Sequence, residues 1–274
     1  MSIHQTGQNF GELVAIMQKL LAPDGCPWDR EQSLDTLRSY LIEESYEVLD
    51  ALEKNDVPEH CEELGDLLFQ IVFQAELRAV EGKFGIEDVI AAIARKMVRR
   101  HPHVFGDLKV SGSSEVLANW GKLKAEEHAE KGKKRRTLEG IPGQLPALLQ
   151  AQRIGEKAAD VGFDWPDVKG VRDKLDEELR ELDEAMAQKD AAAIGEELGD
   201  VLFTLTRLGS KLGAPPEDAL RACIRRFRAR FEEMEDRAAE GGKVIKGMSL
   251  EEMDGLWRDA KKALRKSETD SKQG

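Results

Sequence analysis

Acidic side chains stand in a pattern that occurs twice in this sequence. Each copy has a Glu-Glu-x-x-Glu motif followed by a Glu-Glu-x-x-Asp motif, and 19 positions separate Glu44 from Glu63 just as they separate Glu178 from Glu197. Residues three positions apart share one face of a helix, so each motif presents a pair of carboxylates. The candidate metal ligands are Glu44, Glu47, Glu63 and Asp66 in the first copy and Glu178, Glu181, Glu197 and Asp200 in the second.

The position of these carboxylates beside apolar stripes indicates a cation site. Glu44 falls between Leu41 and Val48 on the helical wheel, and Asp66 adjoins Leu67. Four carboxylates brought together by two packed helices raise one another's pKa unless divalent cations neutralise them. Oxygen-only ligands select Mg²⁺ or Mn²⁺, and the absence of a Glu-x-x-His motif disfavours a di-iron site. One such motif in a chain with 53 acidic residues would be read as a solvated face, but the linked repeat favours Mg²⁺.

The acidic pattern belongs to an internal duplication with an offset of 134 positions, which also aligns residues 62–69 with 196–203. Charged residues make up 34% of the 274 residues and aromatic residues 5%, and apolar residues recur at helical spacing. The sequence therefore predicts an all-α fold of two tandem helical-bundle domains. The expected domains are residues 1–130 and 146–266, joined by a linker over 131–145 and followed by a frayed tail over 267–274.

Helical periodicity and helix-stop signals give the expected element boundaries. Residues 26–29 and 106–114 are expected to form loops, and Pro102 is expected to end the helix before it. The expected helices span residues 9–21, 33–53, 58–80, 86–100, 115–136, 146–161, 171–188, 191–212, 216–237 and 249–264.

The formal charge of −12 disfavours a nucleic-acid polymer or an acidic membrane as partner. The three cysteines are scattered and odd in number, so we predict neither a disulfide framework nor a zinc site. No apolar h-region opens the sequence and no apolar run reaches the length of a membrane span. These features predict a cytoplasmic protein.

Basic and aromatic residues follow each acidic pattern at helical spacing. Cations beside Mg²⁺ suggest a polyphosphate ligand, and an indole near a lysine could stack on a base while the ammonium meets a phosphate. The alternative is that each tryptophan belongs to the core and that the arginines complement helix dipoles. The residues in question are Lys96, Arg100 and Trp120 in the first half and Arg226, Arg230, Trp257 and Lys261 in the second.

Several longer strings stand out in the sequence. They are Cys26-Pro27-Trp28-Asp29, Leu41 through Glu47, Glu63-Leu64-Gly65-Asp66, Arg99 through Phe105, and Gly162-Phe163-Asp164-Trp165. With these strings the chain resembles the two-domain MazG family of nucleoside triphosphate pyrophosphohydrolases. The resemblance covers nearly the whole chain and implies an all-α NTP pyrophosphatase fold, a homodimer and Mg²⁺ dependence. It also implies hydrolysis of a nucleoside triphosphate to monophosphate and pyrophosphate, as nucleotide-pool housekeeping.

The resemblance also implies roles for individual residues. The eight carboxylates become metal ligands, and Lys174, Arg226, Arg230 and Trp257 become triphosphate and nucleoside contacts. In two-domain relatives the C-terminal copy is usually credited with catalysis, although the first copy here retains all its carboxylates. We expect water to attack the α-phosphorus, with Glu177 or Glu178 as the residue that orients or deprotonates it.

A second hypothesis treats the chain as a non-catalytic helical module. Such a module would bind a nucleotide or a protein partner through the same acidic and basic faces. It predicts Mg²⁺-dependent binding without turnover, and the intact carboxylate sets of both copies argue against it.

Overall fold

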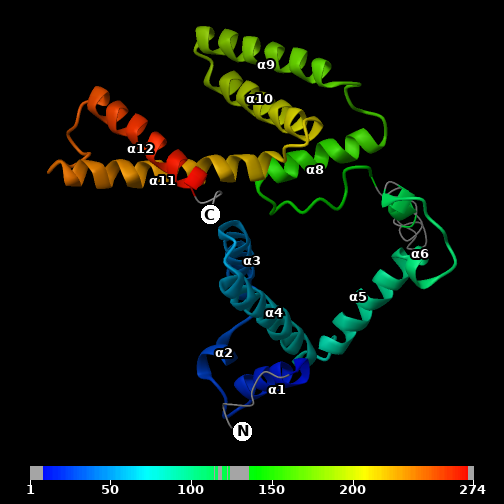
Figure 1. The fold of residues 1–274 in the computed structure, drawn as a ribbon. Helices are drawn as coiled ribbons and strands as arrows, with labels where there is room; N and C mark the ends of the chain where they lie inside the picture. The colour runs from blue at the N-terminus through cyan, green and yellow to red at the C-terminus, as the bar shows by residue number, and fades with distance from the viewer. Residues whose placement is uncertain (1–8, 114, 117–118, 122, 124–135, 271–274) are drawn as a thin grey trace. The chain divides into compact units, whose positions relative to one another are not determined.

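A computed structural model describes residues 9–113, 115–116, 119–121, 123 and 136–270. All regular elements in these residues are helices, which confirms the predicted all-α class (Figure 1). The chain divides into two compact units, residues 1–132 (unit 1) and 133–274 (unit 2). The helices are α1 (Phe10–Leu21), α2 (Pro27–Glu31), α3 (Leu37–Lys54), α4 (Val57–Val80), α5 (Ile86–Arg100), α6 (Pro102–Phe105), α8 (Ala147–Asp160), α9 (Val168–Gln188), α10 (Ala191–Lys211), α11 (Pro216–Glu240) and α12 (Leu250–Asp270).

Some sequence predictions about helix boundaries are wrong. Pro27 begins a short helix, α2, where a loop was expected, because the first helical position needs no backbone N–H. Helix α5 ends at Arg100, before Pro102, as predicted, but Pro102 also begins a further short helix, α6, that was not expected. Helix α12 continues to Asp270, beyond its expected end at residue 264 and into the tail expected to be frayed. Most of the helix expected over residues 115–136 lies outside the described residues. No described helix is long and apolar enough to cross a membrane.

Each unit is built on a helical hairpin with the same tight turn. Asn55 in unit 1 and Lys189 in unit 2 both have φ of 56°, in the left-handed region that ends a helix. The next residue, Asp56 or Asp190, caps the following helix by accepting a hydrogen bond from the backbone N–H of Glu59 or of Ala192 and Ala193. The matching turns give the two hairpins, α3–α4 and α9–α10, the same register between their acidic motifs.

In unit 1 the hairpin packs through an apolar core. Helix α1 lies against α4, and α5 continues from the end of α4. The buried core side chains are Met17, Leu37, Val72, Phe73, Ala75 and Ile86.

In unit 2 the hairpin packs through a core that is partly polar. Helix α8 packs against α10 and α11, and α12 packs along α11 (Figure 1). Thr206 and Arg207 are buried at the positions that correspond to Val72 and Phe73 in unit 1. Gly155 of α8 makes room for Arg207, because a Cβ at this glycine would lie 2.3 Å from the Cδ of Arg207.

Candidate functional site

The α3–α4 hairpin brings together three of the predicted ligands of unit 1. Each of Glu44, Glu63 and Asp66 offers a carboxylate oxygen, and these oxygens lie within 4.8 Å of one another. The pKa of Glu44 is raised by burial and by repulsion from Asp66 and Glu47, and that of Glu63 by burial and by repulsion from Glu47 and Asp66. We call this group the N-terminal acidic cluster.

The α9–α10 hairpin repeats this arrangement in unit 2. One oxygen each of Glu178, Glu197 and Asp200 again lie within 4.8 Å of one another. The Glu178 side chain is buried, Glu197 is half-buried and Asp200 is exposed. Burial and the charges of Glu181 and Asp200 raise the pKa of Glu197. We call this group the C-terminal acidic cluster.

The fourth predicted ligand of each copy stands at the edge of its cluster. Glu47 contributes to the raised pKa of Glu44 through charge repulsion and a side-chain hydrogen bond, and Glu181 contributes to the raised pKa of Glu197 through charge repulsion. An Arg180 Nη2 lies 3.4 Å from an oxygen of Glu181. The structure therefore brings together three carboxylates of each predicted set of four.

A lysine distinguishes the C-terminal cluster from the N-terminal one. The Lys174 Nζ lies 2.9 Å from a carboxylate oxygen of Glu177 and 2.9 Å from one of Glu178, so its pKa is raised by both partners. The position that corresponds to Lys174 in unit 1 is Tyr40, whose ring packs edge-on against Trp28 at 5.9 Å between centroids. Only the C-terminal cluster thus has a cation at this position.

Glu177 lies outside the C-terminal acidic cluster. Its side chain is exposed and accepts a hydrogen bond from Lys174, which holds the pKa of Glu177 below its usual range. A carboxylate with a lowered pKa is a weak base. Of the two candidates for activating water, only Glu178 belongs to the cluster, and Lys174 contacts both.

The predicted substrate contacts of unit 2 other than Lys174 lie on α11 and α12. The Arg230 guanidinium carbon lies 5.8 Å from the centroid of the Trp257 ring, and Phe227 contacts the same ring at 5.0 Å between centroids. Arg226 lies one turn before Arg230, and Lys261 one turn after Trp257. Among the described residues, neither arginine hydrogen-bonds or forms an ion pair with the C-terminal acidic cluster. Sequence spacing pointed to Trp257 but not to Phe227.

The predicted substrate contacts of unit 1 lie on α5 and beyond it. Lys96 and Arg100 belong to α5, which packs against α4 and α6. Trp120 contacts His101 edge-on at 5.1 Å between ring centroids, and His101 in turn lies 5.6 Å from His103. A histidine that was absent from the predicted site, His101, therefore contacts this tryptophan.

The donors of both clusters fit a hard divalent cation. Their carboxylate oxygens converge, and the raised pKa values of Glu44, Glu63 and Glu197 show that nearby basic groups do not offset their mutual repulsion. Oxygen-only donor sets of this kind suit Mg²⁺ or Mn²⁺. Glu44, Glu63 and Asp66 would hold an ion in unit 1, and Glu178, Glu197 and Asp200 one in unit 2.

We expect Mg²⁺ to raise the melting temperature more at pH 7.5 than at pH 5. Between the usual carboxyl pKa and the raised pKa of Glu63 and Glu197, the folded state binds more protons than the unfolded state. Without metal, stability in this window therefore increases as pH falls, because protons relieve the repulsion. Mg²⁺ competes with these protons, so its effect shrinks at low pH. Thermal melts with and without Mg²⁺ at constant ionic strength measure the difference.

The control for this effect is the double variant Glu63→Gln/Glu197→Gln. It should melt at a higher temperature than the wild type without metal at pH 7.5, and Mg²⁺ should shift it less. An equal Mg²⁺ shift in the variant and the wild type would show that the clusters do not bind the ion.

The fold and the clusters define a class: a duplicated all-α protein with a cluster of carboxylates between the paired helices of each copy. The model of the MazG nucleotide pyrophosphohydrolase domain matches residues 32–105 and 168–231, which contain the two hairpins. The chain belongs to the MazG family, and the expectation of a hydrolase of this family is confirmed.

Curated relatives cover most of the chain. It is 45% identical over 253 residues to the nucleoside triphosphate pyrophosphohydrolase of Escherichia coli (strain K12), and the aligned region covers 91% of this chain and 96% of the relative. It is 44% identical over 258 residues to the nucleoside triphosphate pyrophosphohydrolase/pyrophosphatase MazG of Thermotoga maritima, covering 94% and 97%. The uncharacterized protein YabN of Bacillus subtilis is 41% identical over 263 residues, covering 94% of this chain and 53% of that protein.

Proposed function

We propose that this protein hydrolyses nucleoside triphosphates to nucleoside monophosphate and pyrophosphate with Mg²⁺, as nucleotide-pool housekeeping in the cytoplasm. The observation that carries the proposal is the convergence of three carboxylates in each hairpin of a chain that belongs to this family. Mn²⁺ is the other metal that the donors suit.

The experiment that tests this function measures pyrophosphate release from a panel of canonical and modified triphosphates with Mg²⁺. The expected products are monophosphate and pyrophosphate in equal amounts. A folded protein that binds triphosphates with Mg²⁺ and releases no pyrophosphate from any of them would establish the non-catalytic module instead.

Bound Mg²⁺ would supply a water of lowered pKa and charge neutralisation for the leaving pyrophosphate. The chain's own groups position the reactants. Glu178 belongs to the cluster and can accept a proton from the attacking water. Glu177 holds the Lys174 ammonium beside the cluster, where the ammonium can meet a phosphate oxygen.

Attack at the α-phosphorus places the solvent oxygen in the monophosphate, so hydrolysis in ¹⁸O-labelled water should label the monophosphate. Label in pyrophosphate alone would rule out this course.

We infer that the C-terminal copy is the more active catalyst. Transition-state charge in phosphoryl transfer is stabilised by cations held in place before the reaction. Lys174 is such a cation at the C-terminal acidic cluster, whereas Tyr40 occupies the corresponding position of unit 1 and packs on Trp28.

We infer that the active form is a homodimer. Large apolar side chains are exposed along both helices of the α9–α10 hairpin and along α11, and a lone protomer would leave them in water. In the part of the chain that the structure describes, no hydrogen bond or ion pair joins the C-terminal acidic cluster to Arg226 or Arg230, so a second copy that covers these faces can supply the cations. Sedimentation analysis checks the inference, and a fully active monomer would refute it. The exposed side chains are Leu179, Met186, Leu198, Leu202, Leu205, Leu220, Ile224, Phe227 and Phe231.

A further inference from the structure

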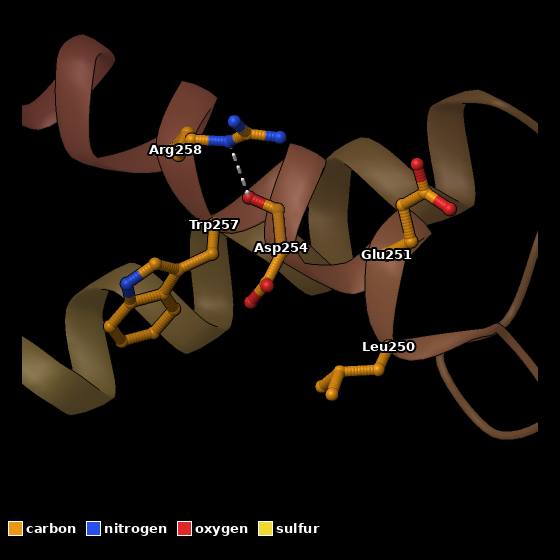
Figure 2. Close-up of a pocket in the computed structure, with 5 residues that line it drawn as sticks. All are labelled: Leu250, Glu251, Asp254, Trp257 and Arg258. Carbon is orange, nitrogen blue, oxygen red and sulfur yellow. Dashed lines mark hydrogen bonds between the residues drawn. The ribbon is translucent and has the colours of Figure 1, made fainter.

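A hollow on α12 has the features of a nucleobase subsite. It has a volume of about 580 Å³ and is lined by Leu250, Glu251, Asp254, Trp257 and Arg258 (Figure 2). Small-molecule sites commonly have volumes of this order and combine an apolar wall with a few polar groups.

Trp257 forms the flat wall of this hollow. Phe227 and Arg230 of α11 contact its ring and hold the indole in position. The indole also lines the hollow, so a planar ring can stack there, and every nucleobase offers such a ring.

Asp254 supplies a polar group on the same side of α12 as this wall. In Figure 2 its carboxylate projects on the same side of α12 as the indole and Leu250, whereas Glu251 and Arg258 project away from them. The Arg258 Nε donates to the backbone carbonyl of Asp254, at 3.2 Å, and not to the carboxylate. Within the part of the chain that the structure describes, the Asp254 carboxylate has no hydrogen-bond or ion-pair partner. It is therefore available to a ligand.

The charge of Asp254 fixes the direction in which a nucleotide would enter. A carboxylate repels phosphates, so the neutral base must face Asp254. The phosphates would then point toward the arginines of α11, of which Arg230 already lies over the indole.

An ionised carboxylate accepts hydrogen bonds and donates none, so it discriminates among base edges. Guanine presents two adjacent donors, N1–H and the 2-amino group, which match the two oxygens. Hypoxanthine keeps N1–H without the amino group. Uracil presents N3–H between two carbonyl oxygens, which a carboxylate would repel.

We propose that Asp254 is a specificity-determining residue that makes this hollow a guanine-selective subsite, with Trp257 as its stacking surface. The proposal rests on the proposed function, because it assigns the base of the triphosphate that the acidic cluster would cleave. It adds a residue and a base preference that the repeated acidic motifs do not predict.

The test compares kcat/KM for GTP, ITP and UTP in the wild type, in Asp254→Asn and in the matched control Asp259→Asn. The wild type should prefer GTP over UTP, with ITP between them. Asp254→Asn should lower the GTP-to-UTP ratio on the order of tenfold, because an amide donates to the carbonyls of uracil and loses the bidentate acceptor pair. Asp259 pairs with Lys262 on the same helix, with 3.3 Å between Oδ1 and Nζ, and does not line the hollow. Its variant should keep the wild-type ratio.

Two outcomes separate this proposal from the proposed function. An unchanged GTP-to-UTP ratio in Asp254→Asn, with hydrolysis intact, overturns the role of Asp254 and leaves the enzyme as proposed. If the folded wild type cleaves none of the triphosphates, calorimetric titration with GMP and UMP decides the matter instead. Tighter binding of GMP that disappears in Asp254→Asn supports the subsite, and equal binding of the two overturns it.

Discussion

Replacement of Glu197 by glutamine is expected to lower the kcat for pyrophosphate release on the order of a hundredfold or more. Enzymes lose activity on this scale when they lose one electrostatic group that stabilises the transition state. Glu197 is one of the three converging carboxylates of the C-terminal acidic cluster, and the side chain of its neighbour Glu178 is tied to Lys174. Glutamine keeps the size of the side chain and removes its charge. The expected loss therefore reflects weaker Mg²⁺ binding, and not altered packing, so the variant should keep the wild-type circular dichroism spectrum.

The matched control for Glu197→Gln is Glu63→Gln, the corresponding change in unit 1. Both glutamates are half-buried members of a converging triad with a raised pKa, so the two variants differ mainly in which cluster they change. We expect Glu63→Gln to retain most of the activity and the double variant to resemble Glu197→Gln. Comparable losses from the two single variants would show two working sites, and a loss with Glu63→Gln alone would assign catalysis to unit 1.

The acidic clusters were predictable because their signal is local and occurs twice. Spacings of three within a motif put two carboxylates on one helix face, and the duplication argues that both hairpins have the same register. The residue in the left-handed conformation at the turn differs between the two copies: it is Asn55 in one and Lys189 in the other. This turn sets the register of the hairpin. Helical periodicity alone therefore predicted the paired helices, while the turn conformation became visible only in the structure.

Contacts between residues far apart in sequence were not predictable in the same way. Phe227 reaches Trp257 from another helix. No pattern within either helix specifies such a contact, because helix packing decides which faces meet.

The core of unit 2 holds an ion-pair network that shows the same limit. Asp164 accepts a hydrogen bond from the Lys211 Nζ and forms an ion pair with the Arg207 Nη2, each at 2.8 Å, across more than 40 positions of sequence. The Arg207 side chain is 6% exposed and that of Asp164 is 19% exposed. Unit 1 has Phe73 and Leu77 at the positions of Arg207 and Lys211. The two copies thus stabilise equivalent hairpins by different means, apolar packing in one and buried ion pairs in the other.

Asp164→Asn is expected to destabilise unit 2 by about 3 kcal/mol, the lower end of the cost of removing one partner from a buried pair. The change leaves Arg207 and Lys211 without their counter-charge. The Arg207 side chain packs against Gly155, and this contact keeps it in place. Urea unfolding followed by circular dichroism measures the loss. The control is Asp176→Asn, which removes an exposed pair with Arg172 in the same unit and should cost less than about 1 kcal/mol.

The pH dependence of the same variant gives an independent check on the network. Burial raises the pKa of Asp164, but hydrogen bonds from Lys211 and Arg207 outweigh this effect and hold the pKa below its usual value. The group therefore contributes stability that is fully present above the usual carboxyl pKa and is lost as pH falls through the lowered value. The free-energy difference between wild type and Asp164→Asn should accordingly be constant from pH 6 to 8 and shrink below about pH 4. A difference no larger than that of Asp176→Asn, or one that grows on acidification, would mean that the buried arginine is held by packing and not by its carboxylate partner.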